Sequence, residues 1–289
     1  MTAHATLLPV RERALRVLGE LPPFSPILNR LMASLASEDV SFAKVADLIE
    51  KDTVMAGNIL KLVNSALYGM RGTVNSVRRA VSLLGVNKVR NATLSMSVAR
   101  MWKQVRTPYG WSMRDFNLRS AGAAILADLL AQNLSVDYAE GAFAAGLFHD
   151  LGELLVAMGC PEEFKQISLL CRPGAKWAAE YELEVLGISH AALSADALAI
   201  WNLPKQIQDA VRFHETPERD PAAKRGRVVL SRIMNVADQY LERVGTCVTV
   251  FDAVDPAAPG FPDPLKLGDR LPVMMTRFEN EFAAIKPYF

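Results

Sequence analysis

Helix start and stop signals recur along most of this chain, and they restrict its fold to a succession of helices. Ser25 precedes Pro26, which places a capping hydroxyl directly before a proline at a first helical position. Ser112 and Asp137 can start two longer helices, the first of which extends to about Asn133. Apolar residues after these signals recur every three or four positions, as they do on one face of a helix. This periodicity predicts an all-α protein.

The clearest interruption of the helical pattern is Thr107-Pro108-Tyr109-Gly110. It divides the chain into two helical lobes, an N-terminal bundle of about residues 14–107 and a second lobe of about residues 111–240. Residues 241–289 are predicted to form a C-terminal extension that contains a loop and a final helix.

Other helix boundaries follow from single residues. Gly85 is expected to end one helix, and Asn87 is expected to start the next. Only Thr246–Phe251 looks strand-like. Later helices are predicted to begin near Glu162, Ala175, Ser189 and Pro204, with another over residues 227–244.

Composition and charge exclude several classes of protein. The chain has 289 residues, of which 51% are hydrophobic and 22% charged, and its formal net charge is +1. These values are typical of a globular protein, and they provide no overall attraction for nucleic acid or an anionic membrane, so neither partner is expected. The best local basic cluster, which is interpreted as a solvated helix face, contains Arg78, Arg79, Lys88 and Arg90.

The cysteines indicate a reducing compartment. Cys160, Cys171 and Cys247 have no CxxC spacing and leave one thiol unpaired. The N-terminus shows no signal peptide, and no stretch of about 18 uninterrupted apolar residues occurs. We therefore expect a cytoplasmic protein.

An adjacent histidine and aspartate, His149 and Asp150, lie in the apolar stretch GLFHDLGE, residues 146–153. This stretch belongs to a helix predicted over residues 137–158. Groups of this kind inside a protein are usually paired, hydrogen-bonded or bound to a metal. The candidate metal ligands in the chain are His149, Asp150, His190, His214 and Asp238.

Imidazole and carboxylate ligands together suit Zn, Mn or Fe. A carboxylate that bridges two cations about 3.5–4 Å apart can help to activate water against a phosphate ester. For His190 or His214 taken alone, the alternative is a histidine satisfied by one hydrogen bond. The sequence contains no identifiable Ser-His-Asp or Cys-His set and no glycine-rich phosphate loop.

Several segments together resemble the HDOD domain, a relative of the HD superfamily of metal-dependent phosphohydrolases that is found in bacterial signalling proteins. GLFHDLGE is similar to the central HD motif, and WNLP after it is similar to a turn of the HDOD domain. We assign this domain to residues 14–215. The remaining similar segments are LPPFSPILNRLMA, VADLIEKDTVMAGNILKLVNSALYG, NSVRRAVSLLGVNKVRN, LGISHAALSADAL and the rest of WNLPKQIQDAVRFHE.

The resemblance implies a helical N-terminal lobe packed on an HD-like lobe. His149 and Asp150 match the HD pair, and Asp238 resembles the closing aspartate of the metal site. His190 and His214 resemble histidines of the two-metal HD relatives. HDOD domains generally lack the full ligand set, so the resemblance implies that catalysis is lost in many members.

This chain departs from the HD pattern at several positions. Arg119 stands where the first histidine ligand is expected, and Glu215 replaces the second histidine of a His-His doublet. Glu153 replaces the usual lysine or arginine after the HD pair. The Gly-Tyr-Pro signature of the relatives that degrade cyclic dinucleotides is absent after His214.

Arg119 is the decisive departure, because a guanidinium group stays protonated and cannot bind a metal ion. We hypothesise that it replaces a metal by pairing with Asp150, Asp238 or both. The alternative is that its side chain extends to solvent on the exposed side of its helix.

The preferred interpretation is a non-catalytic regulatory protein of bacterial signal transduction, which binds a protein or a small ligand through a degenerate HD cleft. The first alternative is a metal-dependent phosphohydrolase of a nucleotide or other phosphate ester, with Asp150 as the candidate catalytic residue. The second is a structural scaffold whose cleft is a relic. The predicted cleft residues are Arg119, His149, Asp150, Glu153, His190, His214 and Asp238.

The cofactor and the partners depend on this choice. No cofactor is expected for the regulatory protein, whereas the hydrolase would use divalent Zn, Mn, Fe or Ni. The expected partners are signalling proteins, and the sequence leaves open whether the chain forms a homodimer.

Overall fold

The described part of the chain folds mainly into helices. In this computed structural model 74% of the described residues are helical, and the same residues contain one isolated bridge, between Val136 and Val228, and no β-strand. The all-α prediction is therefore confirmed. The strand-like segment at 246–251 and the helix start at Ala175 lie outside the described residues. The structure describes residues 8–35, 42–69, 72–170, 179–223, 227–244 and 262–289.

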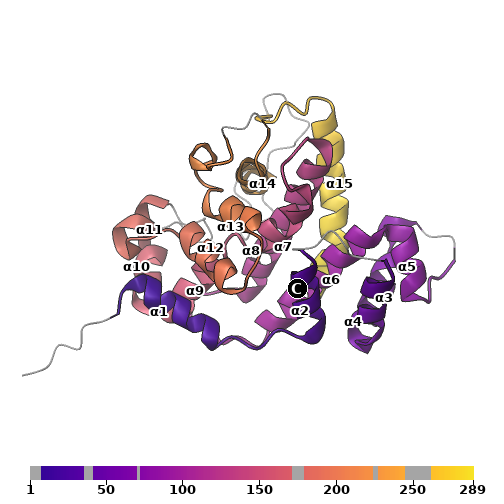
Figure 1. Cartoon of the computed structure of the whole chain (residues 1–289), viewed down its shortest axis with the longest axis horizontal. Helices are drawn as coiled ribbons and strands as arrows, with labels where there is room; N and C mark the ends of the chain where they lie inside the picture. Colours follow the sequence, from indigo (N-terminus) through magenta and orange to yellow (C-terminus); the bar gives the residue numbers. More distant parts are fainter. Residues whose placement is uncertain (1–7, 36–41, 70–71, 171–178, 224–226, 245–261) are drawn as a thin grey trace, which may run out of the picture.

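The N-terminal lobe packs four shorter helices around one longer helix, α6 (Figure 1). Most residues of α6 are buried, because α2, α3, α4 and α5 pack against it and it also contacts α7 and α8 of the other lobe. The elements of this lobe are α2 (Pro26–Ser34), α3 (Phe42–Glu50), α4 (Thr53–Val63), the 3-10 turn η2 (Ala66–Tyr68), α5 (Val77–Leu84) and α6 (Val86–Trp102).

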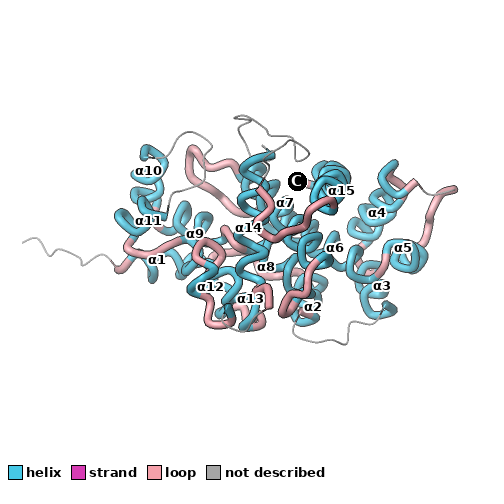
Figure 2. Tube along the Cα trace, turned by 90° about the horizontal axis from the view of Figure 1, so that it is seen from above, coloured by secondary structure: helices cyan, strands magenta, loops and turns pink. Residues whose placement is uncertain are grey.

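The HD-like lobe is built around α7, which packs on α8 and α14, while α12 packs on α9 and α13 (Figure 2). Short 3-10 turns, η3 (Ala139–Gly141) and η4 (Pro217–Arg219), connect parts of this lobe. Its helices are α7 (Met113–Asn133), α8 (Ala142–Phe148), α9 (Leu151–Gly159), α10 (Pro161–Leu170), α11 (Ala179–Leu186), α12 (His190–Ile200), α13 (Lys205–Arg212) and α14 (Leu230–Val244).

The first and last helices both pack on the HD-like lobe. Helix α1 (Val10–Arg16), with the 3-10 turn η1 (Val17–Gly19) after it, lies against α9 and α12, at the end of the molecule opposite to α3, α4 and α5 (Figure 1). Helix α15 (Arg270–Ile285), followed by η6 (Lys286–Tyr288), runs along α7 and also touches η2 of the N-terminal lobe. The C-terminal helix therefore contacts both lobes.

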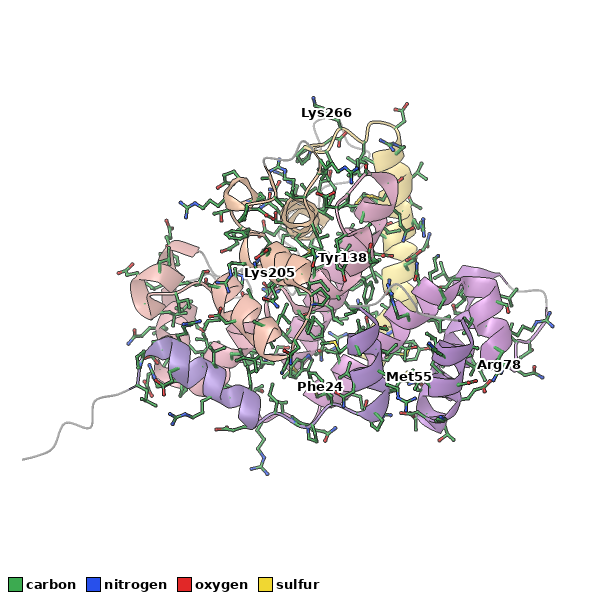
Figure 3. The ribbon with its side chains drawn as sticks, in the orientation of Figure 1. Phe24, Met55, Arg78, Tyr138, Lys205 and Lys266 are labelled. Atoms are coloured by element: carbon green, nitrogen blue, oxygen red, sulfur yellow. The ribbon has the colours of Figure 1, made fainter. Side chains whose placement is uncertain are left out.

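Side chains also connect the two lobes directly. Phe24, which is labelled in Figure 3, packs edge-on against Trp201 with the ring centroids 4.9 Å apart. Tyr138 adopts a left-handed backbone conformation, and its hydroxyl donates to the carbonyl of Leu35. These contacts join the two ends of α2 to the HD-like lobe.

Most of the sequence-predicted helix starts are confirmed. The hydroxyls of Ser25, Ser112 and Ser189 each accept a hydrogen bond from a backbone N–H in the first turn of the following helix. The expectation for Asn87 was wrong, because α6 begins one residue earlier. Gly85, at φ 85°, ends α5 and directly precedes α6, which leaves no separate capping residue between them.

The helix predicted over residues 137–158 starts later than Asp137, because α8 begins at Ala142 after η3, and it is also broken at its centre. Helix α8 ends at Phe148 and α9 begins at Leu151, so His149 and Asp150 occupy the turn between them. Glycines on both sides allow neighbouring backbones to come close. A Cβ atom on Gly146 would lie 2.5 Å from the Cα of Ala124, and one on Gly152 would lie 2.1 Å from the carbonyl oxygen of His190.

The same segment, Ala139–Gly159, has the length and composition of a membrane-spanning helix, with a mean hydropathy of 1.3. However, 94% of that window is buried inside the protein. Its apolar character is explained by its position at the centre of the core, between α7, α12 and α13.

Only part of the basic cluster that was predicted to be a solvated helix face is exposed to solvent. Arg78 lies at the outer edge of the N-terminal lobe and pairs with Asp47 (Figure 3). In contrast, Arg90 is buried and donates to the backbone carbonyl of Glu140 at 3.4 Å. The prediction was wrong for Arg90 because α6 is enclosed by both lobes.

A largely buried carboxylate, Asp128 on α7, lies close to this arginine at the junction of the lobes. Burial raises the pKa of Asp128 from 3.8 to about 6, and the nearby charge of Glu281 adds to this effect against the opposing charge of Arg90. Gln132 donates a hydrogen bond to Asp128 at 2.7 Å. The carboxyl group is therefore harder to ionise in the folded chain than in the unfolded chain.

Asp128→Asn is expected to stabilise the protein in a pH-dependent way. The pKa of Asp128 is higher in the folded chain than in the unfolded chain. The wild-type carboxyl therefore makes its full contribution to stability below the unfolded pKa of 3.8, and this contribution is lost as the pH rises through about 6. Asparagine does not ionise and still accepts from Gln132. The advantage of the variant should grow by about 1–3 kcal/mol between about pH 4 and about pH 8, measured by urea denaturation. An advantage that does not change with pH would contradict the assignment.

Candidate functional site: a degenerate HD cleft

All the predicted cleft residues meet at one place in the HD-like lobe, although they come from separate elements. All of them except Arg119 are buried. Arg119 lies on α7, His149 and Asp150 in the turn between α8 and α9, Glu153 on α9, His190 at the start of α12, His214 after α13, and Asp238 on α14.

Arg119 points into the cleft and not to solvent, since only 19% of its side chain is exposed. Its Nε atom lies 2.7 Å from Oδ2 of Asp150, and a terminal nitrogen of the same guanidinium pairs with Glu153. The predicted ion pair with Asp150 is confirmed. Glu153 is a further partner that the sequence did not predict, because it follows Asp150 by three residues and is therefore on the same side of α9.

His149 contacts two carboxylates. Its Nδ1 atom donates to the carbonyl of Gly146 at 2.8 Å, and this leaves Nε2 facing Oδ2 of Asp150 and Oδ1 of Asp238, both at 3.0 Å. Burial alone would lower the pKa of His149, but the two carboxylates raise it to about 9. Burial would also raise the pKa of Asp150, yet the charges of Arg119 and His149 hold it well below its usual range.

Glu182 on α11 is a cleft residue that the sequence did not reveal. It is fully buried and accepts from the backbone N–H of His190 at 2.8 Å and from Nδ1 of the same residue at 2.6 Å. Glu182 therefore orients the imidazole so that its Nε2 atom faces Asp150 and His214. Burial lowers the pKa of His190, but Glu182 and Asp150 raise it well above its usual value.

His214 completes the group of imidazoles. Its Nδ1 atom donates to the carbonyl of Val211 at 2.7 Å. Its Nε2 atom lies 3.3 Å from Nε2 of His190 and 3.7 Å from Oδ2 of Asp238. The alternative that His190 and His214 are isolated histidines with a single hydrogen bond is therefore wrong.

Three of these residues have a spacing that fits one metal ion. Asp150, His190 and His214 can each offer an atom within 4.8 Å of the other two. Nε2 of His190 lies 3.3 Å from Oδ1 of Asp150, and the same distance separates it from Nε2 of His214. Tetrahedral ligands at about 2.1 Å from a zinc ion are separated by about 3.4 Å, which agrees with both distances.

A second metal fits this cleft poorly. The other oxygen of Asp150 pairs with Arg119, whose charge occupies the side of the cleft where a bridging carboxylate would meet a second cation. Glu153, Glu182 and His190 also lie close together. However, the 2.6 Å between His190 Nδ1 and Glu182 Oε1 fits a shared proton better than two ligands of one metal.

Protons and one arginine balance the buried carboxylates of this cleft. The neighbouring carboxylates raise the pKa of both His149 and His190 and therefore favour the protonated form of each imidazole. Burial also raises the pKa of Glu153, although Arg119 opposes this effect. A metal ion would have to displace the protons from the imidazoles before binding, since only neutral imidazole is a ligand.

This lobe is all-α, and its His-Asp pair lies at a helix break and faces an aspartate of a later helix. These features define the HD-like class. Within that class, the HDOD domain profile matches residues 21–217 of this chain. The chain therefore belongs to the HDOD family, as the sequence motifs predicted.

Similar proteins support the same fold. An uncharacterised protein from Treponema pallidum (strain Nichols) is 23% identical over 239 residues, which are 78% of this chain and 43% of the relative. This chain thus spans less than half of that protein. An HDOD domain protein of unknown function from Geobacter sulfurreducens has a TM-score of 0.71 and 21% identity, with 96% of each chain covered.

Two further solved structures share the fold. A candidate signal transduction protein from Marinobacter aquaeolei VT8 has a TM-score of 0.65 and 22% identity over 99% of this chain and 61% of its own. A candidate phosphohydrolase from Shewanella amazonensis SB2B has a TM-score of 0.69 and 21% identity over 96% of this chain and 97% of its own. At these identities the likeness establishes the fold alone.

Proposed function

We propose that this protein is a non-catalytic regulatory HDOD module of bacterial signal transduction. The observation that carries the proposal is the double ion pair of Arg119 with Asp150 and Glu153; the sequence resemblance implies a histidine ligand at the position of Arg119. A fixed guanidinium charge compensates the carboxylates that a metal would otherwise hold. The cleft then stabilises the HD-like lobe and performs no hydrolysis.

The regulatory role is exerted by binding a signalling protein or a small ligand in the cytoplasm. The Marinobacter protein of the same fold, described as a candidate for signal transduction, is consistent with this role. The larger size of the Treponema relative is consistent with an HDOD domain that acts together with other domains.

The test is the metal content of the full chain, purified without a chelator or a metal-binding tag and incubated with Zn²⁺, Mn²⁺, Fe²⁺ or Ni²⁺ before gel filtration. Wild type should retain far less than one metal per chain and should not hydrolyse bis(p-nitrophenyl) phosphate. Arg119→His restores an imidazole at this position and should increase metal retention, because it removes the competing charge.

Asp150→Asn serves as the control, with its circular dichroism spectrum and melting temperature compared with wild type. Near-stoichiometric metal in wild type, together with hydrolysis that disappears in a folded Asp150→Asn variant, would overturn the proposal.

A metal-dependent phosphohydrolase is the second candidate, and the spacing of Asp150, His190 and His214 favours it. When bound there, a divalent metal would supply Lewis acidity and a hydroxide nucleophile. Glu182 would keep His190 in the tautomer that presents Nε2, while His149, which Asp238 orients, would bind the phosphate ester together with Arg119. Retained metal in wild type with turnover would support this candidate, by the same experiment.

A further inference from the structure

A groove at the junction of the lobes lies outside the HD cleft. It is formed by η2 and α6 of the N-terminal lobe and by α15, which runs along α7 in Figures 1 and 2. Its volume of about 310 Å³ is at the lower end of the range for small-molecule sites. The lining residues are Leu67, Tyr68, Lys88, Val273, Thr276, Arg277, Asn280 and Glu281.

Two cationic side chains converge in this groove. Nζ of Lys88 and Nε of Arg277 lie 3.0 Å and 2.9 Å from the same carboxylate oxygen, Oε1 of Glu281. The two nitrogens are therefore less than about 6 Å apart, a spacing at which a single oxyanion can contact both. One carboxylate faces two cations, so the lining of the groove has a net charge of +1.

The wall beside these cations is apolar. Leu67 and the ring of Tyr68 line the groove on the side of η2, and Nζ of Lys88 lies 5.8 Å from the centre of that ring. Val273, on the opposite wall, is 72% exposed although its neighbour Met274 is buried in the core. An exposed apolar residue next to a pair of cations suits a ligand that has an anionic end and an apolar body.

A smaller recess of about 40 Å³ adjoins the groove and shares Tyr68, Lys88 and Glu281 with it. Asp128 and Asn91 line the recess. Its size limits it to about one or two water molecules, and its acidic lining disfavours an anion. An anionic group would therefore stay in the outer groove, beside Lys88 and Arg277.

We propose that this groove binds a small organic phosphate or phosphonate, with its anionic oxygens between Lys88 and Arg277 and its apolar body against Tyr68 and Val273. None of these residues belongs to the HD cleft, so the site goes beyond the proposed function and does not depend on it. Occupancy would connect η2 and α6 to α15 and hold the two lobes together.

The C-terminal segment also contacts the N-terminal lobe at a second place, beyond the groove. The hydroxyl of Tyr288 donates to the carbonyl of Asn58 on α4 at 3.2 Å, and Lys103 donates to the carbonyl of Tyr288 at 3.4 Å. Helix α15 is thus already joined to the N-terminal lobe beyond the groove. A ligand that binds this arrangement and not the unfolded chain raises the melting temperature, and the increase grows with the logarithm of the ligand concentration above Kd.

The test is isothermal titration of the full chain with phenylphosphonate, a non-hydrolysable probe with a dianionic end and a ring. Saturable binding to wild type is expected. Lys88→Gln and Arg277→Gln should each weaken it by about tenfold, since each removes a charged hydrogen bond to the anion. Arg78→Gln, which removes an exposed arginine far from the groove, is the matched control and should bind as wild type does.

Two further arms complete the experiment. Inorganic phosphate tests the contribution of the ring, and Val273→Asp should weaken phenylphosphonate more than inorganic phosphate because it places a charge on the apolar wall. No saturable binding, or equal binding by wild type and Arg277→Gln, would overturn the site. Equal affinity for the two probes would overturn the assignment of the apolar wall.

Discussion

Replacing Arg119 with alanine is expected to lower the free energy of unfolding by about 3–5 kcal/mol, measured by urea denaturation with a chelator present. Asp150 is fully buried, and Glu153 nearly so. Without the guanidinium group, two carboxylates on the same side of α9 would face each other with only the neighbouring imidazolium groups for compensation. The chelator prevents a divalent cation from replacing the lost charge.

Arg100→Ala is a matched control for this prediction. Arg100 pairs with Asp52 at 2.7 Å, the same distance as that between Arg119 and Asp150. However, 43% of the Arg100 side chain is exposed, so its loss should cost less than about 1 kcal/mol. Equally small losses in both variants would show that Arg119 does not neutralise the cleft.

Gly152→Ala is expected to destabilise the protein by at least about 3 kcal/mol, because it forces two helices apart. The added Cβ atom would lie 2.1 Å from the carbonyl oxygen of His190, a backbone atom that no side-chain rotation can move. Separating α9 from α12 would also break the hydrogen bond from the Gly152 amide to the hydroxyl of Ser194. Urea denaturation measures the loss.

Gly57→Ala provides the comparison, since no atom outside α4 lies within 4 Å of its added Cβ. Alanine favours a helix more than glycine does, so this variant should be as stable as wild type or more stable by up to about 1 kcal/mol. If Gly152→Ala were equally harmless, α9 and α12 could not approach each other as closely as the structure indicates.

Some features of this fold were predictable because they depend only on interactions between residues close together in the chain. A capping hydroxyl such as that of Ser25 or Ser112 bonds to a backbone N–H three residues away, so neighbouring residues suffice to recognise it. The motif around His149 and Asp150 also identified the family, which the match over residues 21–217 confirms.

The break between α8 and α9 was not predictable in the same way. Every residue from Ala142 to Phe148 is apolar or glycine and is compatible with a continuous helix. The break occurs where glycines let the segment pack against α7 on one side and α12 on the other. These contacts join residues far apart in the chain.

Glu182 illustrates why part of the cleft was missed. Helix α11 also carries Glu180 and Glu184, and nothing in its local sequence distinguishes the glutamate that becomes buried. Only the approach of α11 to the start of α12 places Glu182 on the N–H and Nδ1 of His190. The same holds for Arg90, which is buried because both lobes enclose α6.

The sequence by itself determined the helical class, the family and most of the cleft residues. Apolar periodicity, capping residues and the His-Asp motif can each be recognised from residues that are close together in the chain. Only the tertiary structure decided that Arg119 pairs with Glu153 in addition to Asp150, that Glu182 orients His190, and that α15 completes a groove with η2 and α6. The physical reason is that an ion pair or a groove depends on distances between elements, which follow from how whole helices pack.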